Sequence, residues 1–313
     1  MPAIHILRAT MLEDILSPQT FQKLRGRVLR EEPLAAYTSW RVGGSADYVY
    51  IPADLDDAAD FLQQLPLDVP LLWLGLGSNT LIRDGGVDGV ALITQGALNG
   101  IAQCDSLIVR AEAGVSCAQI ARHTARLGLS GLEFMAGIPG TVGGALAMNA
   151  GCYGGETWQR VSKVETINRS GHRQVRLVSD YEVGYRHVKG PANEWFVAGY
   201  FELRPGEKKR SLEDIRLLLE KRNMSQPTSW PNGGSVFRNP PGGYAARLIE
   251  QSGLKGLAIG KARVSEKHAN FIINEGEATA ADIEKLILQV ADVVLQQQGI
   301  RLNPEVRIIG KSA

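Results

Sequence analysis

The sequence has few cysteines and no pattern typical of a metal site or a disulfide framework. Its three cysteines, Cys104, Cys117 and Cys152, are widely spaced and form no C-x-x-C pair. None of the five histidines lies four residues from another, so no H-x-x-x-H pair is present. An odd number of isolated cysteines indicates a reducing compartment, and no bound metal is expected.

Long hydrophobic runs and an excess of one charge are absent as well. No apolar stretch approaches the ~20 residues that a membrane-spanning helix requires. The first residues, Met1 to His5, lack the apolar segment of a signal peptide. The chain carries 34 Lys and Arg against 33 Asp and Glu, a net charge of +1, which argues against a general nucleic-acid binder. We expect a cytoplasmic protein with no membrane or nucleic-acid partner, and nothing indicates its oligomeric state.

Glycine is abundant, and it is concentrated in uncharged segments. The densest segment, residues 137–151, reads GIPGTVGGALAMNAG and contains no charged residue. Thr141 is placed to cap a helix that begins at Val142. Exposed N–H groups beside glycine and a helix N-terminus can hold a phosphate. From these residues alone, a pyrophosphate cradle and a tight turn packed in a core are equally good interpretations.

Two further glycine-rich loops favour the cradle. An apolar run at residues 69–74 predicts a buried strand that leads into the sequence GLGSN at 75–79. Residues 40–44 read WRVGG and repeat this chemistry upstream. Neither G-x-G-x-x-G nor G-x-x-x-x-G-K-[ST] occurs in these loops, so a dinucleotide would be bound by a fold of another kind.

Hydrophobic periodicity predicts a mixture of helices and strands, with no internal repeat. Residues 204–210 combine proline, glycine and charge, which makes them the best domain boundary. Helices are expected at 54–65, 116–127, 211–222, 244–252 and 279–298, and strands at 107–111, 161–169, 173–178, 195–203, 269–274 and 306–309.

Taken in chain order, seven sequence blocks resemble the UDP-N-acetylenolpyruvoylglucosamine reductase family. Three are the glycine loops, and the other four are GYR at 184–186, GSVFRNP at 234–240, SEKHANFIIN at 265–274 and PEVR at 304–307. The resemblance runs from about residue 37 to 310 and favours the shorter type of this family. The compact stretch 240–254 leaves little room for the tyrosine-bearing insertion of the longer type.

The resemblance implies an α+β fold with three parts. Residues 31–207 would form a two-subdomain FAD-binding module of the vanillyl-alcohol-oxidase-like (PCMH) type. Residues 208–313 would form a smaller α+β substrate-binding domain, whose closing strand near 304–310 returns to the active site. Residues 1–30 precede the resemblance, and their irregular apolar face predicts an N-terminal helical extension.

The resemblance also implies a reaction. The family uses NADPH, through FAD, to reduce the enolpyruvyl group of UDP-N-acetylglucosamine-enolpyruvate to UDP-N-acetylmuramate in peptidoglycan precursor synthesis. No histidine lies in 75–84 or 137–151, so non-covalent FAD is expected. The residues do not indicate a preference for NADPH over NADH.

Three residues match the family's catalytic positions. Arg186 would stabilise the enediolate charge, because a guanidinium holds a carboxylate with two parallel hydrogen bonds. Ser235 would donate the proton, and Glu305 would donate a hydrogen bond in its protonated form. Taken alone, each residue has a structural alternative: a salt bridge for Arg186, a turn-capping hydroxyl for Ser235, and an ion pair with Arg307 for Glu305.

Binding residues are carried over in the same way. Substrate contacts would come from Tyr185, Arg238, Asn239, Lys267 and His268, for which solvated surface side chains are an equal alternative. Two other functions stay open: an FAD-dependent oxidase or dehydrogenase acting on another sugar or hydroxy acid, and a non-catalytic flavin-binding protein. The expected FAD contacts are Arg41, Gly43, Gly44, Gly75, Gly77, Ser78, Asn79, Gly137, Ile138, Pro139, Gly140, Thr141, Gly143, Gly144, Ala145, Asn149 and Gly151.

Overall fold

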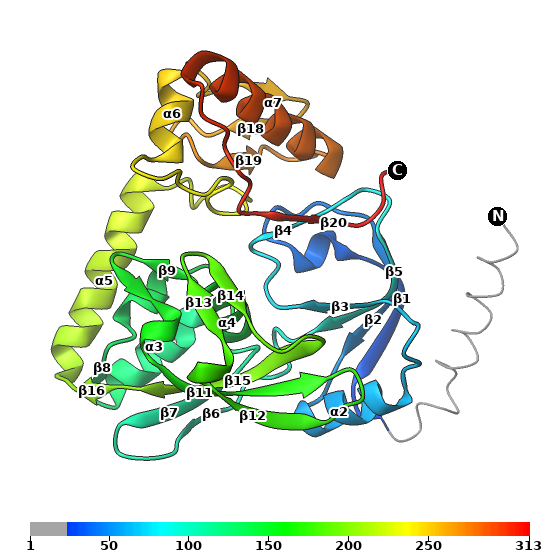
Figure 1. Cartoon of the computed structure of the whole chain (residues 1–313), viewed down its shortest axis with the longest axis vertical. Coiled ribbons are helices and arrows are strands. Elements are labelled where there is room, and N and C mark those ends of the chain that lie inside the picture. Colours follow the sequence, from blue (N-terminus) through cyan, green and yellow to red (C-terminus); the bar gives the residue numbers. More distant parts are fainter. Residues whose placement is uncertain (1–23) are drawn as a thin grey trace, which may run out of the picture.

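The computed structural model describes residues 24–313 and arranges them in two subdomains of helices packed on sheets and a C-terminal domain (Figure 1). The predicted N-terminal extension lies outside the described residues as far as residue 23. From Arg27 onward the chain forms a strand, so the helical prediction is wrong for residues 27–30. The physical reason is tertiary: Val28 and Leu29 pair with Tyr50 and Val49 of the next strand.

The first subdomain is a four-stranded sheet in the order β1-β2-β5-β3. Its strands are β1 (Arg27–Pro33), β2 (Ser45–Ile51), β5 (Val87–Ile93) and β3 (Leu71–Leu74), and β1 alone runs antiparallel to its neighbour. Helix α2 (Leu55–Gln64) begins after Asp54, whose side chain accepts a hydrogen bond from Asp57 N–H. The ring of Phe61 on α2 stacks on Tyr50 of β2 at 3.9 Å, which fixes the helix on the sheet.

The second subdomain is a five-stranded antiparallel sheet in the order β12-β11-β15-β7-β6. These strands are β12 (Arg173–Leu177), β11 (Val161–Asn168), β15 (Glu194–Glu202), β7 (Ile108–Glu112) and β6 (Ile101–Gln103). Helices α3 (Cys117–Arg126), α4 (Val142–Met148) and α5 (Lys208–Ser225) share one core with this sheet. Two short hairpins complete it, β9 (Gly151–Cys152) with β10 (Gly155–Glu156) and β13 (Glu182–Gly184) with β14 (His187–Lys189). A third short pair joins strands that are distant in the sequence, β8 (Leu129–Ser130) and β16 (Arg204–Pro205).

Helix α5 crosses from the second subdomain to the C-terminal domain. The helix begins at Lys208, the residue at which the substrate-binding domain was expected to begin. Ile215 of α5 is nevertheless buried in the core of the second subdomain. The helix therefore packs with the preceding residues, although it follows the proline- and glycine-containing segment.

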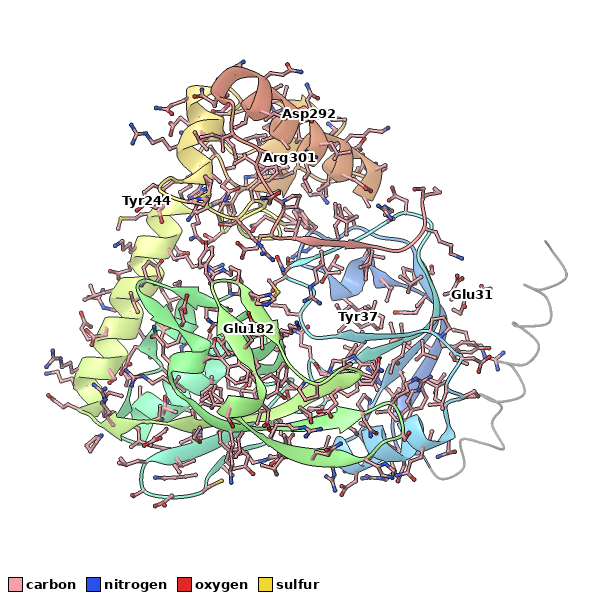
Figure 2. All side chains as sticks on the ribbon, in the orientation of Figure 1. Glu31, Tyr37, Glu182, Tyr244, Asp292 and Arg301 are labelled. Atoms are coloured by element: carbon pink, nitrogen blue, oxygen red, sulfur yellow. The ribbon has the colours of Figure 1, made fainter. Side chains whose placement is uncertain are left out.

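The C-terminal domain packs two helices on a small antiparallel sheet. The helices are α6 (Ala245–Gln251) and α7 (Ala280–Gln298), and the strands are β17 (Ala258–Ile259), β18 (Ala262–Val264) and β19 (Ile272–Asn274). The last strand, β20 (Arg307–Ile309), leaves this domain and pairs in parallel with β4 (Thr80–Ile82) of the first subdomain, as Figure 1 shows. The side chains in Figure 2 fill the interior of all three parts, whereas Tyr244, beside α6, is 68% exposed.

Trp40 joins the first subdomain to the C-terminal domain. Its side chain is fully buried in the C-terminal core, and its indole N–H donates to Ile272 O at 2.8 Å. The backbone oxygen of Trp40 accepts from Asn274 Nδ2 at 3.0 Å. The Asp84 carboxylate accepts from the N–H groups of Ala280 and Ala281 at the start of α7. These two parts of the chain therefore form one packed body.

Replacing Trp40 with Ala should lower the free energy of unfolding by about 3–5 kcal/mol, because a large buried side chain and a buried hydrogen bond are lost together. Urea unfolding of the flavin-free protein measures the change. Trp230→Ala is the matched control, since Trp230 is 45% exposed. Equal losses in the two variants would contradict this role of Trp40.

No helix in residues 24–313 combines the length and the apolar character needed to cross a membrane. The same residues contain no group of three His, Cys, Asp or Glu side chains arranged to hold a metal ion.

Candidate active site

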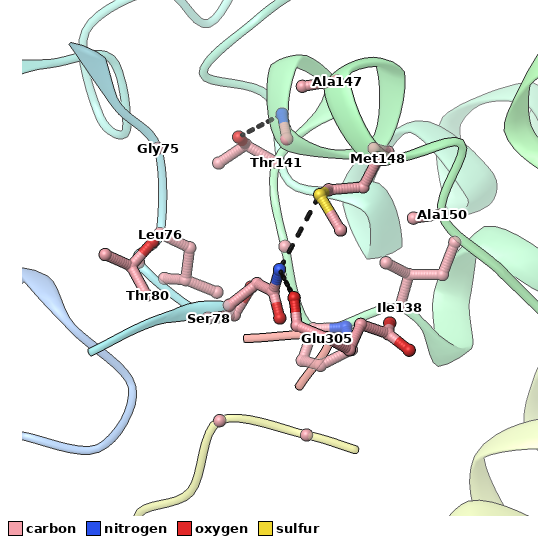
Figure 3. Close-up of a pocket in the computed structure, with 18 of the residues that line it drawn as sticks. Gly75, Leu76, Ser78, Thr80, Ile138, Thr141, Ala147, Met148, Ala150 and Glu305 are labelled. Atoms are coloured by element: carbon pink, nitrogen blue, oxygen red, sulfur yellow. Dashed lines mark hydrogen bonds between the residues drawn. The ribbon is translucent and has the colours of Figure 1, made fainter. Parts of the chain in front are cut away.

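A cavity of about 290 Å³ lies where the three parts of the chain meet. The loop after β3 and the segment that leads into α4 form facing walls (Figure 3). The β13–β14 hairpin, the loop between α5 and α6, and the segment before β20 contribute the remaining sides. Many of the residues expected to contact FAD line it: Gly75, Gly77, Ser78, Asn79, Gly137, Ile138, Pro139, Gly140, Thr141, Gly144, Ala145 and Gly151.

Five of the expected FAD contacts lie outside the cavity wall: Arg41, Gly43, Gly44, Gly143 and Asn149. Three of them are glycines that make close packing contacts. A Cβ on Gly44 would lie 2.2 Å from Asp84 O, one on Gly43 would lie 2.9 Å from Ile82 Cβ, and one on Gly143 would lie 2.8 Å from Ala113 Cβ. These contacts explain why glycine occupies the three positions without reference to a ligand.

The loop at residues 76–79 offers unpaired donors to an anion. Within residues 24–313, the backbone N–H groups of these four residues donate no hydrogen bond to the chain. The start of α4 differs, because the N–H groups of Val142 and Gly143 donate to Val115 O and Ala113 O. Thr141 caps this helix as predicted, and its hydroxyl accepts from Gly144 N–H at 3.4 Å. The glycine loop at residues 75–79 is therefore the better phosphate cradle.

The glycine segment that leads into α4 also leaves space for a bound dinucleotide. A Cβ on Gly144 would meet no protein atom closer than Thr141 Oγ1 at 3.7 Å. A Cβ on Gly234, across the cavity, would meet nothing within 4 Å. Neither position is close to other protein atoms, so packing does not explain why it is glycine. Because glycine has no side chain, it leaves this part of the cavity open to a ligand. The residues present thus fit a flavin nucleotide.

Substitution of the neighbouring glycines 143 and 144 by Val should have different effects, on the free energy of unfolding at Gly143 and on FAD binding at Gly144. Gly144→Val should weaken FAD binding at least about tenfold, because the added methyl groups occupy the cavity, while the flavin-free protein keeps its stability. Gly143→Val should instead lower the free energy of unfolding, because Ala113 blocks the new side chain. Flavin titration and urea unfolding separate the two effects. Unchanged FAD affinity in Gly144→Val would place the flavin elsewhere.

Arg186 lies at the second position of the two-residue turn between β13 and β14. Its φ is +52°, a left-handed conformation that is unfavourable for a residue with a Cβ. The guanidinium makes three hydrogen bonds: from Nε to Glu305 Oε1 at 2.9 Å, from Nη2 to Gly151 O at 2.8 Å, and from Nη1 to Asn149 O at 3.4 Å. The side chain is thereby fixed with its charge at the cavity wall.

Glu305 reaches the cavity from the segment before β20. Its N–H donates to Val236 O at 2.8 Å, and its carbonyl accepts from Asn79 Nδ2 at 3.1 Å, as drawn in Figure 3. Burial raises the pKa of the Glu305 carboxyl, and the nearby Arg186 guanidinium opposes this effect. The neutral acid therefore persists to higher pH than in a solvent-exposed glutamate. The ion pair of Glu305 is with Arg186 and not with Arg307, the structural alternative that the sequence left open.

Ser235 lines the cavity from the loop between α5 and α6. Within the part of the chain that the structure describes, no hydrogen bond is assigned to its hydroxyl group. The nearby Gly234 N–H donates to Asn232 Oδ1 at 2.9 Å, so Asn232 fills the turn-capping role that the sequence left open for Ser235. Gly233 packs on the Trp40 ring, which a Cβ would approach to 2.4 Å. The serine hydroxyl is thus available to a ligand.

The five expected substrate contacts lie outside the cavity wall. Tyr185 is 48% exposed, with its ring centroid 5.1 Å from Arg186 Cζ. Asn239 Oδ1 accepts from Ala245 N–H at the start of α6, and the Lys267 ammonium donates to Asn223 O. Arg238 is exposed, and its charge, like that of Arg186, opposes the rise that burial causes in the pKa of Glu305. His268 Nδ1 accepts from Asn270 N–H, and burial lowers the pKa of its imidazole.

Sequence reasoning missed several residues of the cavity wall. Most of them lie within or beside a recognised block. Met148 and Ala150 belong to the glycine segment 137–151, and Arg307 belongs to the block at 304–307. Gln226 had no such signal. The wall residues absent from the predicted site are Trp73, Leu74, Leu76, Thr80, Ala147, Met148, Ala150, Cys152, Gln226, Gly233, Gly234, Phe271 and Arg307.

Two family models match the chain. Residues 46–175 match an FAD binding domain, and residues 226–309 match the C-terminal domain of UDP-N-acetylenolpyruvoylglucosamine reductase. The expected α+β architecture, an FAD-binding module of two subdomains followed by a smaller domain, is confirmed by these matches and by the fold.

Similar proteins carry the same name. The chain is 58% identical over 287 residues to UDP-N-acetylenolpyruvoylglucosamine reductase of Legionella pneumophila strain Corby, covering 91% of this chain and 93% of that protein. It is 52% identical over 316 residues to the protein of that name from Coxiella burnetii strain Dugway, covering 95% of this chain and 100% of that protein. The crystal structure of the Thermus caldophilus reductase superposes with a TM-score of 0.75 at 31% identity, over 91% of this chain and 99% of that one. The chain therefore belongs to the UDP-N-acetylenolpyruvoylglucosamine reductase family and is an FAD-dependent oxidoreductase.

Proposed function

We propose that the protein reduces the enolpyruvyl group of UDP-N-acetylglucosamine-enolpyruvate to give UDP-N-acetylmuramate, with NADPH as reductant and non-covalently bound FAD, in the cytoplasm. The observation that carries this proposal is the convergence of Arg186, Ser235 and Glu305 on a cavity walled by two glycine loops. The names of the relatives and the match to the family's C-terminal domain support it.

FAD, when bound, supplies hydride transfer from NADPH to the carbon–carbon double bond of the substrate. The N–H groups of residues 76–79 would hold its diphosphate, and the residues from Gly137 to Ala145 would border the rest. Reduction of the enolpyruvyl group adds one hydride and one proton. The protein's own side chains would stabilise the negative charge that the hydride creates and would supply the proton.

Arg186 and Glu305 would stabilise the negative charge that spreads onto the substrate carboxylate when hydride adds to the double bond. The guanidinium stays protonated at any relevant pH and can hold both carboxylate oxygens. The neutral form of Glu305, which burial favours, can donate a hydrogen bond to the same group without adding charge. Both side chains are largely shielded from water, with 19% and 13% of their surface exposed, which strengthens these interactions.

Ser235 would donate the proton from Oγ to the α-carbon. A serine hydroxyl is a weak acid, so it can act only on a strongly basic carbanion held in a preorganised site. The Ser235 hydroxyl lies in the cavity wall and makes no hydrogen bond within residues 24–313, which supports this role. Substrate contacts by Tyr185, Arg238, Asn239, Lys267 and His268 stay predictions, because all five lie outside the cavity wall.

An anaerobic spectroscopic titration tests this function. Flavin absorbance should bleach with NADPH and return when the enolpyruvyl UDP-sugar is added. Bleaching without return would reject this substrate and favour an oxidase or dehydrogenase acting on another sugar or hydroxy acid. A protein that takes up no FAD would overturn the proposal altogether. Replacing NADPH with NADH in the same titration measures the nicotinamide preference.

A further inference from the structure

Asn149 ends helix α4 and lies just behind the cavity wall. It adopts a left-handed conformation with φ +43° and ψ +51°, and 2% of its surface is exposed. Asparagine tolerates this conformation better than most residues with a side chain. Conformation alone, however, does not explain why its amide group is buried.

The side chain of Asn149 connects three segments of the second subdomain. Both N–H bonds of its amide are used, because Nδ2 donates to Gly184 O and to Glu156 Oε2, each at 3.0 Å. Its Oδ1 accepts from Trp158 N–H at 3.1 Å. A buried amide with three partners is a rigid connection, because breaking any of these bonds leaves a polar group without water.

Two of the contacts of Asn149 bear directly on Arg186. Gly184 ends strand β13, and the turn of Tyr185 and Arg186 follows it at once. The Asn149 amide therefore holds the base of the turn through Gly184 O, while its backbone oxygen accepts from Arg186 Nη1 at 3.4 Å. The left-handed backbone of Arg186 needs such support, because an unfavourable conformation persists only where its surroundings enforce it. The hairpin that carries this turn begins at Glu182, labelled in Figure 2.

We propose that Asn149 is a positioning residue for Arg186, not a contact of the cofactor as the resemblance implied. Helix α4 connects the cavity to the arginine turn. Thr141 at its start borders the cavity, and Asn149 at its end holds the turn that carries Arg186. This inference rests on the proposed function, because it concerns the step in which Arg186 stabilises charge on the substrate.

The test uses Asn149→Gly, which keeps the left-handed backbone and removes the amide, and Asn149→Asp, which keeps the acceptor for Trp158 and removes both donors. Stopped-flow absorbance separates flavin reduction by NADPH from reoxidation by the enolpyruvyl UDP-sugar. Reoxidation should slow roughly 10- to 100-fold, as expected for a misplaced catalytic group. FAD affinity and the rate of flavin reduction should stay within about twofold of the unsubstituted protein, because Arg186 acts only in the second half-reaction.

A double-mutant cycle shows whether Asn149 acts through Arg186. In an Arg186→Lys background, Asn149→Gly should cause little further loss, because residues that act through one another are not additive. Additive losses would overturn the proposal, as would a loss of FAD affinity that parallels the slower reoxidation. Asn193 is the matched control, because it is also left-handed, with φ +59°, but is exposed and outside the cavity wall. Asn193→Gly should change neither half-reaction.

Hydrogen exchange of the holoprotein gives a measurement that does not depend on the substrate. Amides of the hairpin at residues 182–189 should exchange at least about tenfold faster in Asn149→Gly, while those of the sheet strand β5 stay unchanged. Unchanged exchange in the hairpin would overturn the positioning role even if reoxidation slows. If the unsubstituted reduced enzyme is not reoxidised by this sugar, the proposed function fails, and the exchange result still decides whether Asn149 holds the turn.

Discussion

Ser235→Ala should leave flavin reduction by NADPH unchanged and slow reoxidation by the enolpyruvyl UDP-sugar about 10²- to 10⁴-fold, the usual contribution of a positioned proton donor. The hydroxyl lines the cavity and is not needed by the turn, where Asn232 binds the Gly234 N–H. Alanine therefore removes the donor without disturbing the fold. Rapid mixing of the reduced enzyme with substrate measures the rate directly.

Two controls make the Ser235 result specific. Ser229→Ala replaces an exposed serine in the same loop and should affect neither half-reaction. The thermal midpoint of Ser235→Ala should match that of the unsubstituted protein, because the hydroxyl makes no hydrogen bond to any other residue between 24 and 313. Unchanged reoxidation in Ser235→Ala would remove the serine from the proton-transfer step and point to solvent or another donor.

Arg186→Lys should lower kcat of the complete reaction about 10²- to 10³-fold, in the range typical for loss of one electrostatic stabiliser. Lysine keeps the positive charge but lacks the planar fork that here bonds Glu305, Gly151 and Asn149 together. The rate of flavin reduction by NADPH should stay unchanged. Steady-state kinetics with the UDP-sugar, combined with the single half-reactions, separates these effects.

Arg216→Lys is the control for the arginine prediction. Arg216 lies on the exposed face of α5 and pairs with Glu213 and Glu220. An exposed ion pair contributes little, so this variant should behave as the unsubstituted protein does. If Arg186→Lys retained full kcat, charge alone would suffice at this position, and the multiple hydrogen bonds of the guanidinium would have no catalytic role.

Local signals predicted the helices and several of the strands, but not β1, β2 and β5 of the first sheet. Thr141 was expected to cap a helix at Val142, and α4 begins there. Strands were expected at 161–169 and 173–178, and the structure has β11 and β12 there, paired with each other. These features depend on neighbours within a few residues, so the sequence contains their determinants.

Tertiary contacts account for what the sequence did not reveal. Gly43 and Gly44 looked like part of a cofactor loop, but they pack against Ile82 and Asp84, some forty positions further along the chain. Gln226, which adjoins none of the recognised blocks, lines the cavity only because the fold brings the segment after α5 there. The resemblance predicted that Arg186, Ser235 and Glu305 share one site, and all three line the cavity. The ion pair of Glu305 with Arg186, and not with Arg307, depends on where β20 lies in the fold.

The return of β20 to β4 has a consequence for biosynthesis. Asn79 contacts the Glu305 backbone across 226 positions of the chain. At about 5–20 residues per second, a ribosome needs roughly 10–45 s to add the intervening residues. During that interval Leu81 and Ile82 of β4, which are fully buried in the finished protein, lack their partner strand. The nascent chain thus keeps an apolar strand unpaired until almost the last residues are made, and only then can the active site be completed.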